Sequence, residues 1–350
     1  MKYTSIGVVV LFSLLYFFAF GQPLDGASVG NYNYILNYNF PDHLVYLDVL
    51  DRIEAESFTS FDLGINNYGI AYFYYVISFF GSTFFYENVE NYTFVINSIL
   101  SVTQIFLLYS MVNSIGGSIS PWFIVTCPTF YFFGAMINKD SLVATLFLLI
   151  IACTLNKKYI LSILFLISIC AIRIQFMLML MIFFPIIISR CTVRTKFLLI
   201  YLFSAVIGVF ASNLFKIVQL DVEGGLNSFV DQMNVEYYIG SLVFNWLKIV
   251  RYLIIPFESF DKIIVGDEIN FLEIFYLLSG IYIFYNFARI FILRNKLIGA
   301  HVNSEILIIL LFCWGYINLL VVSPVTEYRY FLMLLPLVII FSAKKTVKSL

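Results

Sequence analysis

Three apolar segments in succession decide the fold class of this chain. Residues 141 to 190 read SLVATLFLLIIACTLNKKYILSILFLISICAIRIQFMLMLMIFFPIIISR. Only short polar turns interrupt this stretch, at Lys157 with Lys158 and again at Arg173, which leaves apolar segments at 141–155, 159–172 and 174–190. Apolar segments that follow one another with so few charges are typical of a polytopic membrane protein.

The composition of the whole chain supports the same fold class. Its 350 residues are 61% hydrophobic and 12% charged, and the mean hydropathy is +0.94. A soluble domain carries about 25% charged residues, so this composition excludes a soluble enzyme. There are enough apolar residues for roughly ten spans of about 20 residues. The net charge of -1, without basic runs, argues against a nucleic-acid partner.

Apolar segments continue on both sides of the central stretch. The sequence predicts further spans at 5–21, 93–113, 121–137, 197–216, 271–293, 304–322 and 330–343. Residues 5–21 also resemble a signal peptide, but an uncleaved first helix fits a polytopic chain better. The segments at 67–84 and 241–258 are ambiguous between spans and surface helices. The prediction is an all-α polytopic membrane protein, a single integral membrane domain over 1–350 with about ten transmembrane helices.

The basic residues decide between these readings, because Lys and Arg near helix ends favour the cytoplasmic side. If 67–84 and 241–258 are external interfacial helices, both termini are cytoplasmic and most predicted cytoplasmic turns are basic. The cytoplasmic bases are then Lys2, Lys157, Lys158, Arg190, Arg194, Lys196, Arg289, Arg294, Lys296, Lys344, Lys345 and Lys348. Two acidic external loops follow from this arrangement, at 22–66 and 217–240. The alternative for 241–258 is a short eleventh span.

Cysteine and histidine residues give no sign of a disulfide or a metal site. The five cysteines, Cys127, Cys153, Cys170, Cys191 and Cys313, are far apart and form no CxxC pair. His43 and His301 are distant in sequence, and no DxD triplet occurs. We therefore expect no disulfide, no zinc centre and no cofactor, and the sequence gives no support for a divalent metal site.

The external bases outside the acidic loops are the candidate ligand-binding groups. They are Lys139, Arg173, Lys248, Arg251 and Arg329. Charged groups near membrane depth are costly and are often functional, and several cations at one face suit an anionic ligand such as a phosphate. The alternative is that each base extends to the interface or neutralises a nearby acid, as Lys139 could with Asp140 and Arg329 with Glu327.

The acids of the first external loop are candidates for the complementary chemistry. A carboxylate beside an alcohol can accept its proton while cations stabilise a phosphate leaving group, as sugar transfer from a lipid phosphate requires. Asp25, directly after the first span, is the leading base candidate, and Asp42 with His43 is the second. For most of these acids, a solvated loop carboxylate is the simpler interpretation.

The order of these features resembles the GT-C class of polyprenyl-linked glycosyltransferases. The similar features are a first span, an acidic external loop and an interfacial helix running from Asn67-Tyr68-Gly69 to Phe80-Gly81. They continue with Pro128, the Asn138-Lys139-Asp140 turn, and the closing Tyr328-Arg329-Tyr330 with Leu335-Pro336. With no appended soluble domain, the chain is most similar to bacterial Wzy-type O-antigen polymerases of lipopolysaccharide biosynthesis.

The resemblance implies a multi-pass protein of the bacterial inner membrane with both termini cytoplasmic. Periplasmic loops at 22–92 and 217–270 would each contain an interfacial helix. The implied activity is polymerisation of undecaprenyl-diphosphate-linked oligosaccharide units at the periplasmic face. Membrane lipids and a chain-length regulator protein are the other implied partners. The implied catalytic residues are Asp25, Asp42, Arg173 and Arg329, and the implied substrate-binding residues are Lys139, Asp140, Arg251, Glu327 and Tyr328.

Two rival functions remain open at the level of the sequence. The first is a GT-C glycosyltransferase that uses a polyprenyl monophosphate sugar, for which fewer cations suffice. The second is a transporter of lipid-linked glycans. Transporters often contain paired repeats and charges at mid-depth, whereas this chain has no visible repeat and most of its charges lie at the predicted external edge.

Overall fold

The computed structural model describes residues 89–115, 139–214, 226–258 and 304–322, with short pieces within 69–77 and 263–269 and isolated positions elsewhere. This part of the chain is helical except for one ribbon of two short strands, which confirms the all-α prediction for the described residues. The predicted spans at 5–21, 271–293 and 330–343 lie largely outside the described residues, and the span at 121–137 lies wholly outside them.

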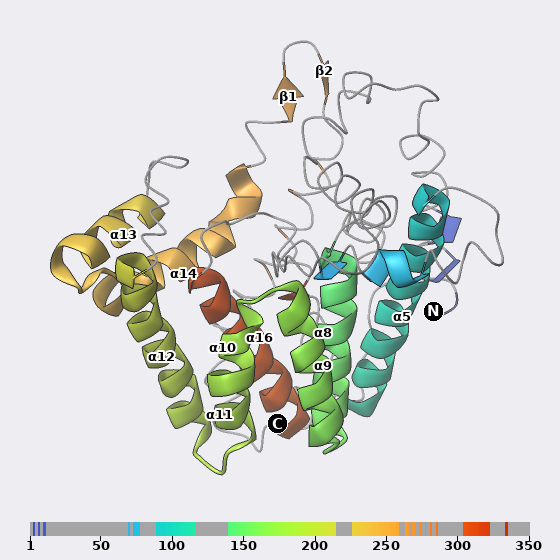
Figure 1. The fold of residues 1–350 in the computed structure, drawn as a ribbon, viewed down its shortest axis with the longest axis horizontal. Coiled ribbons are helices and arrows are strands. Elements are labelled where there is room, and N and C mark those ends of the chain that lie inside the picture. Colours follow the sequence, from blue (N-terminus) through green and yellow to red (C-terminus); the bar gives the residue numbers. More distant parts are fainter. Residues whose placement is uncertain are drawn as a thin grey trace, which may run out of the picture.

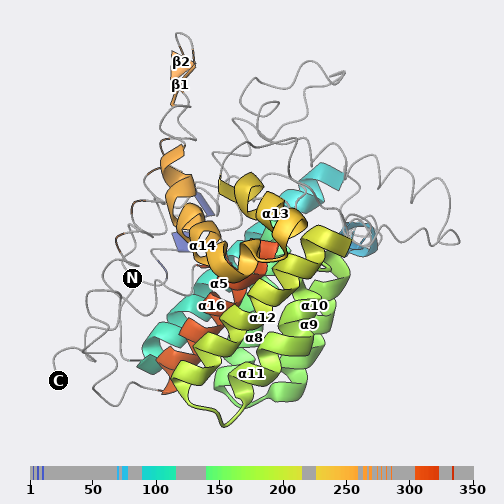
Figure 2. The same ribbon diagram turned by 90° about the vertical axis from the view of Figure 1, so that its left-hand side faces the viewer.

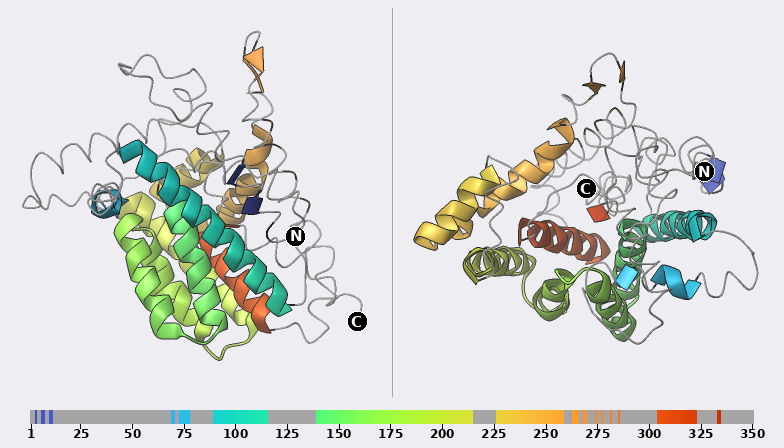
Figure 3. Two further views of the ribbon diagram at one scale, coloured as in Figure 1. Left: turned by 90° about the vertical axis from the view of Figure 1, so that its right-hand side faces the viewer. Right: turned by 45° about the horizontal axis from the view of Figure 1, so that its top comes forward.

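The described helices form a bundle with two further helices at one end (Figure 1). The elements are α5 (Val89–Ile115), α8 (Asp140–Leu155), α9 (Tyr159–Ile172), α10 (Phe176–Leu178), the π-helical turn η3 (Met179–Phe183), α11 (Phe184–Ile188), α12 (Val193–Leu214), α13 (Leu226–Tyr237), α14 (Gly240–Glu258), β1 (Ile264–Val265), β2 (Glu268–Ile269) and α16 (Ser304–Val322). Strands β1 and β2 pair antiparallel. In Figure 3 (left), α5 runs obliquely across the bundle, where it packs against α8.

Polar residues end the helices of the central stretch as the sequence indicates. Helix α8 ends before Asn156, whose side-chain amide donates to Ala152 O at 2.8 Å, and Lys157 takes a positive φ of 58° that turns the chain back into α9. Inside this hairpin the hydroxyls of Thr154 and Ser162 lie 3.0 Å apart. The predicted segment 159–172 coincides with α9, and 304–322 coincides with α16.

The third segment of the central stretch is one rod with a local irregularity. Helices α10 and α11 continue into each other through η3. Pro185 lies at the start of α11, where it has no amide proton to donate, and the wider turn directly precedes it. Gly315 of α16 faces this turn: a Cβ built on Gly315 would meet Met179 Cε at 3.2 Å. The absence of a side chain at Gly315 lets α16 approach η3 closely.

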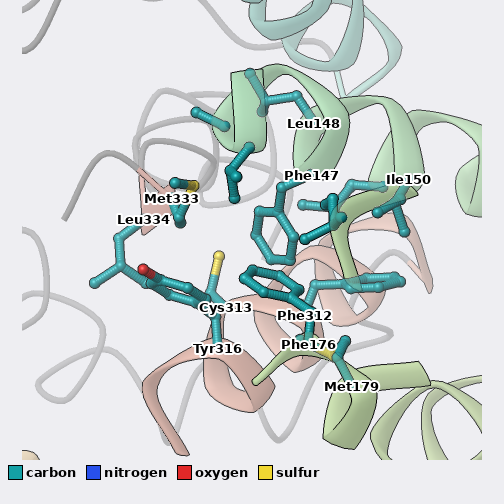
Figure 4. Packing of buried hydrophobic residues seen from close by; sticks show 14 of the residues in the cluster. Phe147, Leu148, Ile150, Phe176, Met179, Phe312, Cys313, Tyr316, Met333 and Leu334 are labelled. Carbon is teal, nitrogen blue, oxygen red and sulfur yellow. The ribbon is translucent and has the colours of Figure 1, made fainter. Parts of the chain in front are cut away.

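Aromatic rings form the centre of the bundle where α8, α10 and α16 meet (Figure 4). The ring of Phe147 lies 6.1 Å from the rings of Phe176 and Phe312 and 5.6 Å from that of Tyr316. All four side chains are buried. Rings at these separations favour tilted and edge-on packing over simple stacking, so this cluster fixes α16 against α8 and α10.

Helices α13 and α14 lie at the end of the bundle where α12 ends, and they run obliquely to its axis (Figures 1 and 2). The sequence predicts a surface helix at 241–258, and α14 occupies 240–258. Helix α13 falls in 217–240, which the sequence treats as an acidic loop. Its apolar residues Leu226, Phe229, Val230, Met233 and Tyr237 recur at helical spacing, and packing against α12 and α14 stabilises it.

Two of the described helices are long and apolar enough to cross a membrane. They contain the stretches Val95–Asn113 and Val193–Asn213, while α8, α9, the α10–α11 rod, the first part of α14 and most of α16 are shorter apolar helices. The outer face of α9 exposes Ile160, Leu164 and Ile167, which are 78%, 53% and 51% accessible. These residues share one helical face, and an apolar face of this kind suits contact with lipid better than contact with water.

Candidate functional site

A buried ion pair joins Asp140, the first residue of α8, to Arg173, the residue that ends α9. Arg173 Nη2 donates to Asp140 Oδ1, and the two side chains are 8% and 0% accessible. Folding of the α8–α9 hairpin brings the pair together across its open end. Asp140 also lies at a helix N-terminus and Arg173 at a helix C-terminus, so each charge opposes the partial charge of its own helix end.

Helix α5 supplies further polar contacts beside this pair. Gln104 Nε2 donates to Ser141 O at 2.9 Å and to Thr145 Oγ1 at 3.0 Å, and Gln104 is buried. Lys139, which is half-buried, directly precedes the pair. The first turn of α8 is therefore held from two sides, by Arg173 and by Gln104.

A second buried ion pair lies in the corner between α12, α13 and α14. Lys248 Nζ donates to Asp231 Oδ1 at 2.6 Å, and the side chains are 7% and 8% accessible. Ser212 Oγ of α12 donates to the same carboxylate oxygen at 3.3 Å. The carboxylate of Asp231 thus links all three helices.

Asn234 is the centre of the hydrogen bonds in this corner. Its Nδ2 donates to Ser241 Oγ at 2.8 Å and to Ser212 Oγ at 3.1 Å, and its Oδ1 accepts from the backbone N–H of Ser241. Gly208 and Gly240 permit the close approach of the helices. A Cβ on Gly208 would lie 2.6 Å from Ser241 Oγ, and one on Gly240 would collide with Val230 O.

The charges of the described residues are distributed unequally between the two ends of the bundle. The α8–α9 turn and the α11–α12 turn lie at the same end (Figure 1), and their bases Lys157, Lys158, Arg190 and Arg194 are exposed. The α9–α10 turn, α13 and α14 lie at the opposite end (Figures 1 and 2). This opposite end contains Arg173 and Lys248, and both of these bases are buried and paired with acids. The exposed cations and the buried ion pairs therefore lie at opposite ends of the bundle.

Of the predicted site residues, the structure brings together Lys139, Asp140 and Arg173. Arg251 lies in α14, one turn after Lys248. The predicted residues Asp25, Asp42, Glu327, Tyr328 and Arg329 fall outside the described residues. The partner of Arg173 is Asp140. The family resemblance implies that Asp140 binds substrate, and the alternative interpretation is that it neutralises Lys139.

Sequence reasoning missed the corner formed by Asp231, Asn234, Ser212 and Ser241. A signal was available in α12, where Ser204, Gly208 and Ser212 recur at intervals of four residues, a pattern that allows close helix packing in membranes.

Among the described residues, no cluster of His, Cys, Asp and Glu has the arrangement of a metal site. The cysteines in this part of the chain, Cys153, Cys170, Cys191 and Cys313, are free thiols.

Comparison of the chain with protein-family models, with curated proteins and with solved structures finds no match.

Proposed function

We propose that this chain is a multi-pass inner-membrane glycosyltransferase that joins undecaprenyl-diphosphate-linked oligosaccharides at the periplasmic face. The buried Asp140–Arg173 pair carries the proposal, because it lies at the end of the bundle opposite the exposed basic turns. If those basic turns are cytoplasmic, the pair lies at the external face. A charged group kept at such a depth is costly, which favours a functional role.

The proposed topology is the ten-span arrangement with both termini in the cytoplasm. The two long apolar helices and the apolar outer face of α9 support it, as does the separation of exposed cations from buried ion pairs. Helix α14 would be an external interfacial helix, with Trp246 (52% accessible) at the membrane surface.

In the proposed reaction a hydroxyl oxygen of one lipid-linked glycan attacks the anomeric carbon of a second. The bond from that carbon to the diphosphate oxygen breaks, and undecaprenyl diphosphate leaves with the bonding electron pair. A carboxylate, Asp25 or Asp42, accepts the hydroxyl proton. Arg173 and Arg329, with Lys139 and Arg251, would stabilise the charge that develops on the diphosphate. Asp140 holds the guanidinium of Arg173 in place.

Glycan profiles of cells provide the test. Loss of the gene is expected to leave single repeat units in place of long chains, whereas loss of a single-sugar transferase would alter the unit itself. The variant Arg173→Ala should reproduce the loss of long chains while the protein still inserts in the membrane. Arg190→Ala, at an exposed base of the opposite end, is the matched control and should leave the chain-length ladder unchanged. A wild-type ladder from Arg173→Ala would contradict the proposed site.

Purified protein offered each lipid donor in turn distinguishes the polymerase from its nearest rival. Transfer from a diphosphate-linked oligosaccharide supports the proposal. Transfer only from a polyprenyl monophosphate sugar would identify the alternative GT-C activity.

A further inference from the structure

Among the described residues, two buried amide oxygens lie on α14 and α16 without hydrogen-bond donors. They are Asn245 Oδ1 of α14 and Asn318 Oδ1 of α16, for which no donor is found around either atom. Both residues are completely buried. A buried carbonyl oxygen that loses its hydrogen bonds to water without replacement destabilises the folded state, so each of these groups requires an explanation.

One hydroxyl connects the two asparagines. Ser204 Oγ of α12 donates to the backbone carbonyl of Asn318 at 2.9 Å and accepts from Asn245 Nδ2 at 3.5 Å. Ser204 is also completely buried, and it lies near the middle of the span candidate Val193–Asn213. The three residues therefore form a buried polar junction of α12, α14 and α16, and unsatisfied polar groups are rare in buried positions.

Donors on the same three helices are bonded to other acceptors. Ser204 has a single hydroxyl proton, and it is used by Asn318 O. Lys248 Nζ is bonded to Asp231, and Trp314 Nε1 donates to Phe197 O at 3.1 Å. One Asn318 amide proton is directed to Trp314 O at 2.9 Å. Exchange of the amide oxygen and nitrogen of Asn318 would remove this bond, and the same exchange in Asn245 would remove its bond to Ser204 Oγ.

We infer that the Ser204–Asn245–Asn318 junction binds a neutral hydroxyl donor. The available atoms are acceptors, so the occupant has to bring protons. The junction itself has no charged side chain, and an unpaired cation would be costly in this setting. A water molecule or a glycan hydroxyl has the required chemistry. Either one has protons to donate to an amide oxygen.

Replacement of the asparagines by leucine tests this inference, because leucine has a similar volume and no polar atoms. If no group binds there, Asn318→Leu removes an uncompensated oxygen and should raise the apparent Tm or leave it unchanged. If a hydroxyl donor binds, the substitution leaves that donor unsatisfied, and the apparent Tm should fall by about 2 °C or more. Asn245→Leu, made separately, should behave in the same way.

Asn156→Leu is the matched control. Asn156 Nδ2 donates to the carbonyl four residues earlier, as Asn318 Nδ2 does, but Asn156 is exposed in the α8–α9 turn. The difference between the two variants therefore isolates the buried site from the loss of the local bond. Melting is measured on the whole protein in detergent, without and with lipid-linked oligosaccharide.

The two arms of the experiment, melting without glycan and melting with glycan, distinguish the source of the hydroxyl. A loss of Tm in Asn318→Leu relative to Asn156→Leu without glycan identifies bound water, and this arm is independent of the proposed function. A loss that appears only with glycan identifies a ligand hydroxyl, and this arm rests on the proposed function. The inference would be overturned if Asn318→Leu and Asn245→Leu had Tm values equal to or higher than that of Asn156→Leu, both without and with glycan. So would a wild-type Tm that rises with sodium or potassium concentration but not in the leucine variants, because the site would then bind a cation.

Discussion

Arg173 and Asp140 are 33 residues apart in the chain and form a buried ion pair across the open end of the α8–α9 hairpin. Each terminates or begins a helix, so the pair closes the hairpin at the end opposite its Asn156 turn. In the proposed function the same pair holds a guanidinium at the external face. Its structural and functional roles can be separated by experiment.

Breaking the pair should be strongly destabilising, whereas removing both charges should not. Arg173→Met removes the guanidinium partner of the buried Asp140 carboxylate, at an expected cost of about 3–5 kcal/mol. The double variant Asp140→Leu with Arg173→Met leaves no charge behind and should recover most of that stability. Unfolding in detergent, followed by circular dichroism, measures both effects. A double variant no more stable than the single one would contradict this account.

Glycan polymerisation by the same double variant separates the two roles of the pair. If Arg173 stabilises the leaving diphosphate, the double variant is stable and inserted but makes no long chains. If the pair acts only on the fold, long chains return together with stability.

Glycine substitutions should distinguish close contacts with backbone atoms from close contacts with a flexible side chain. Gly240→Ala brings a methyl group against Val230 O and the backbone N–H of Asn234, which cannot move without displacing α13, so we expect a loss of about 2 kcal/mol or more. Gly315→Ala meets the flexible end of the Met179 side chain at 3.2 Å and makes an ordinary contact with Phe183 at 3.5 Å, so it should cost less than about 1 kcal/mol. Thermal melting of the two variants side by side provides the comparison, and the reverse order would show that the α13–α14 corner is loosely packed.

The Asn234 side chain should be essential to the corner between α12, α13 and α14. Asn234→Ala leaves the backbone N–H of Ser241 without its acceptor and removes three further bonds, so we expect a loss of about 2–4 kcal/mol. Gln232→Ala in the same helix removes one exposed bond, to Glu236, and should change stability by less than about 0.5 kcal/mol. Protease cleavage near Tyr238, which is exposed at the α13–α14 turn, should increase only in the Asn234 variant. Similar cleavage rates in both variants would argue against this role.

Cysteine labelling tests the sidedness directly. Cys191 is exposed in the α11–α12 turn, and Tyr238 lies in the α13–α14 turn at the other end. With the remaining cysteines replaced by alanine, Tyr238→Cys should react with a membrane-impermeant maleimide in intact cells. Cys191 as the sole cysteine should react only after the membrane is made permeable. Labelling of both positions from the same side would refute the ten-span topology.

Several helices, inside and outside the central stretch, could be predicted from the sequence because the sequence patterns that mark them are local. The boundaries of α9 and α16 coincide with the apolar segments, and α14 begins within one residue of its predicted start. Runs of apolar residues bounded by polar turns depend on chain positions that are close together. Helix α13 was missed because its acidic residues suggested a loop, although its apolar residues have helical spacing.

The candidate site could be predicted only in part. Lys139 and Arg173 were selected as costly cations at two external turns, and the family resemblance implied Asp140 as a substrate-binding residue. The structure brings these three together. The link between Lys248 and Asp231 was not foreseen, because it depends on how α13 folds back onto α14. The unsatisfied amides of Asn245 and Asn318 give no signal in the sequence, since a buried and an exposed asparagine look alike there.

By itself, the sequence determined the helical, apolar character of this protein and the distribution of its exposed bases along the chain, because both follow from residue type and short-range spacing. Only the tertiary structure decided that Arg173 pairs with Asp140, that Asp231 joins three helices, and that Ser204 lies between two asparagines. The partners of each polar side chain lie on other helices. They meet only when turns and glycine contacts bring those helices close together, because a hydrogen bond requires its donor and acceptor atoms to lie about 3 Å apart.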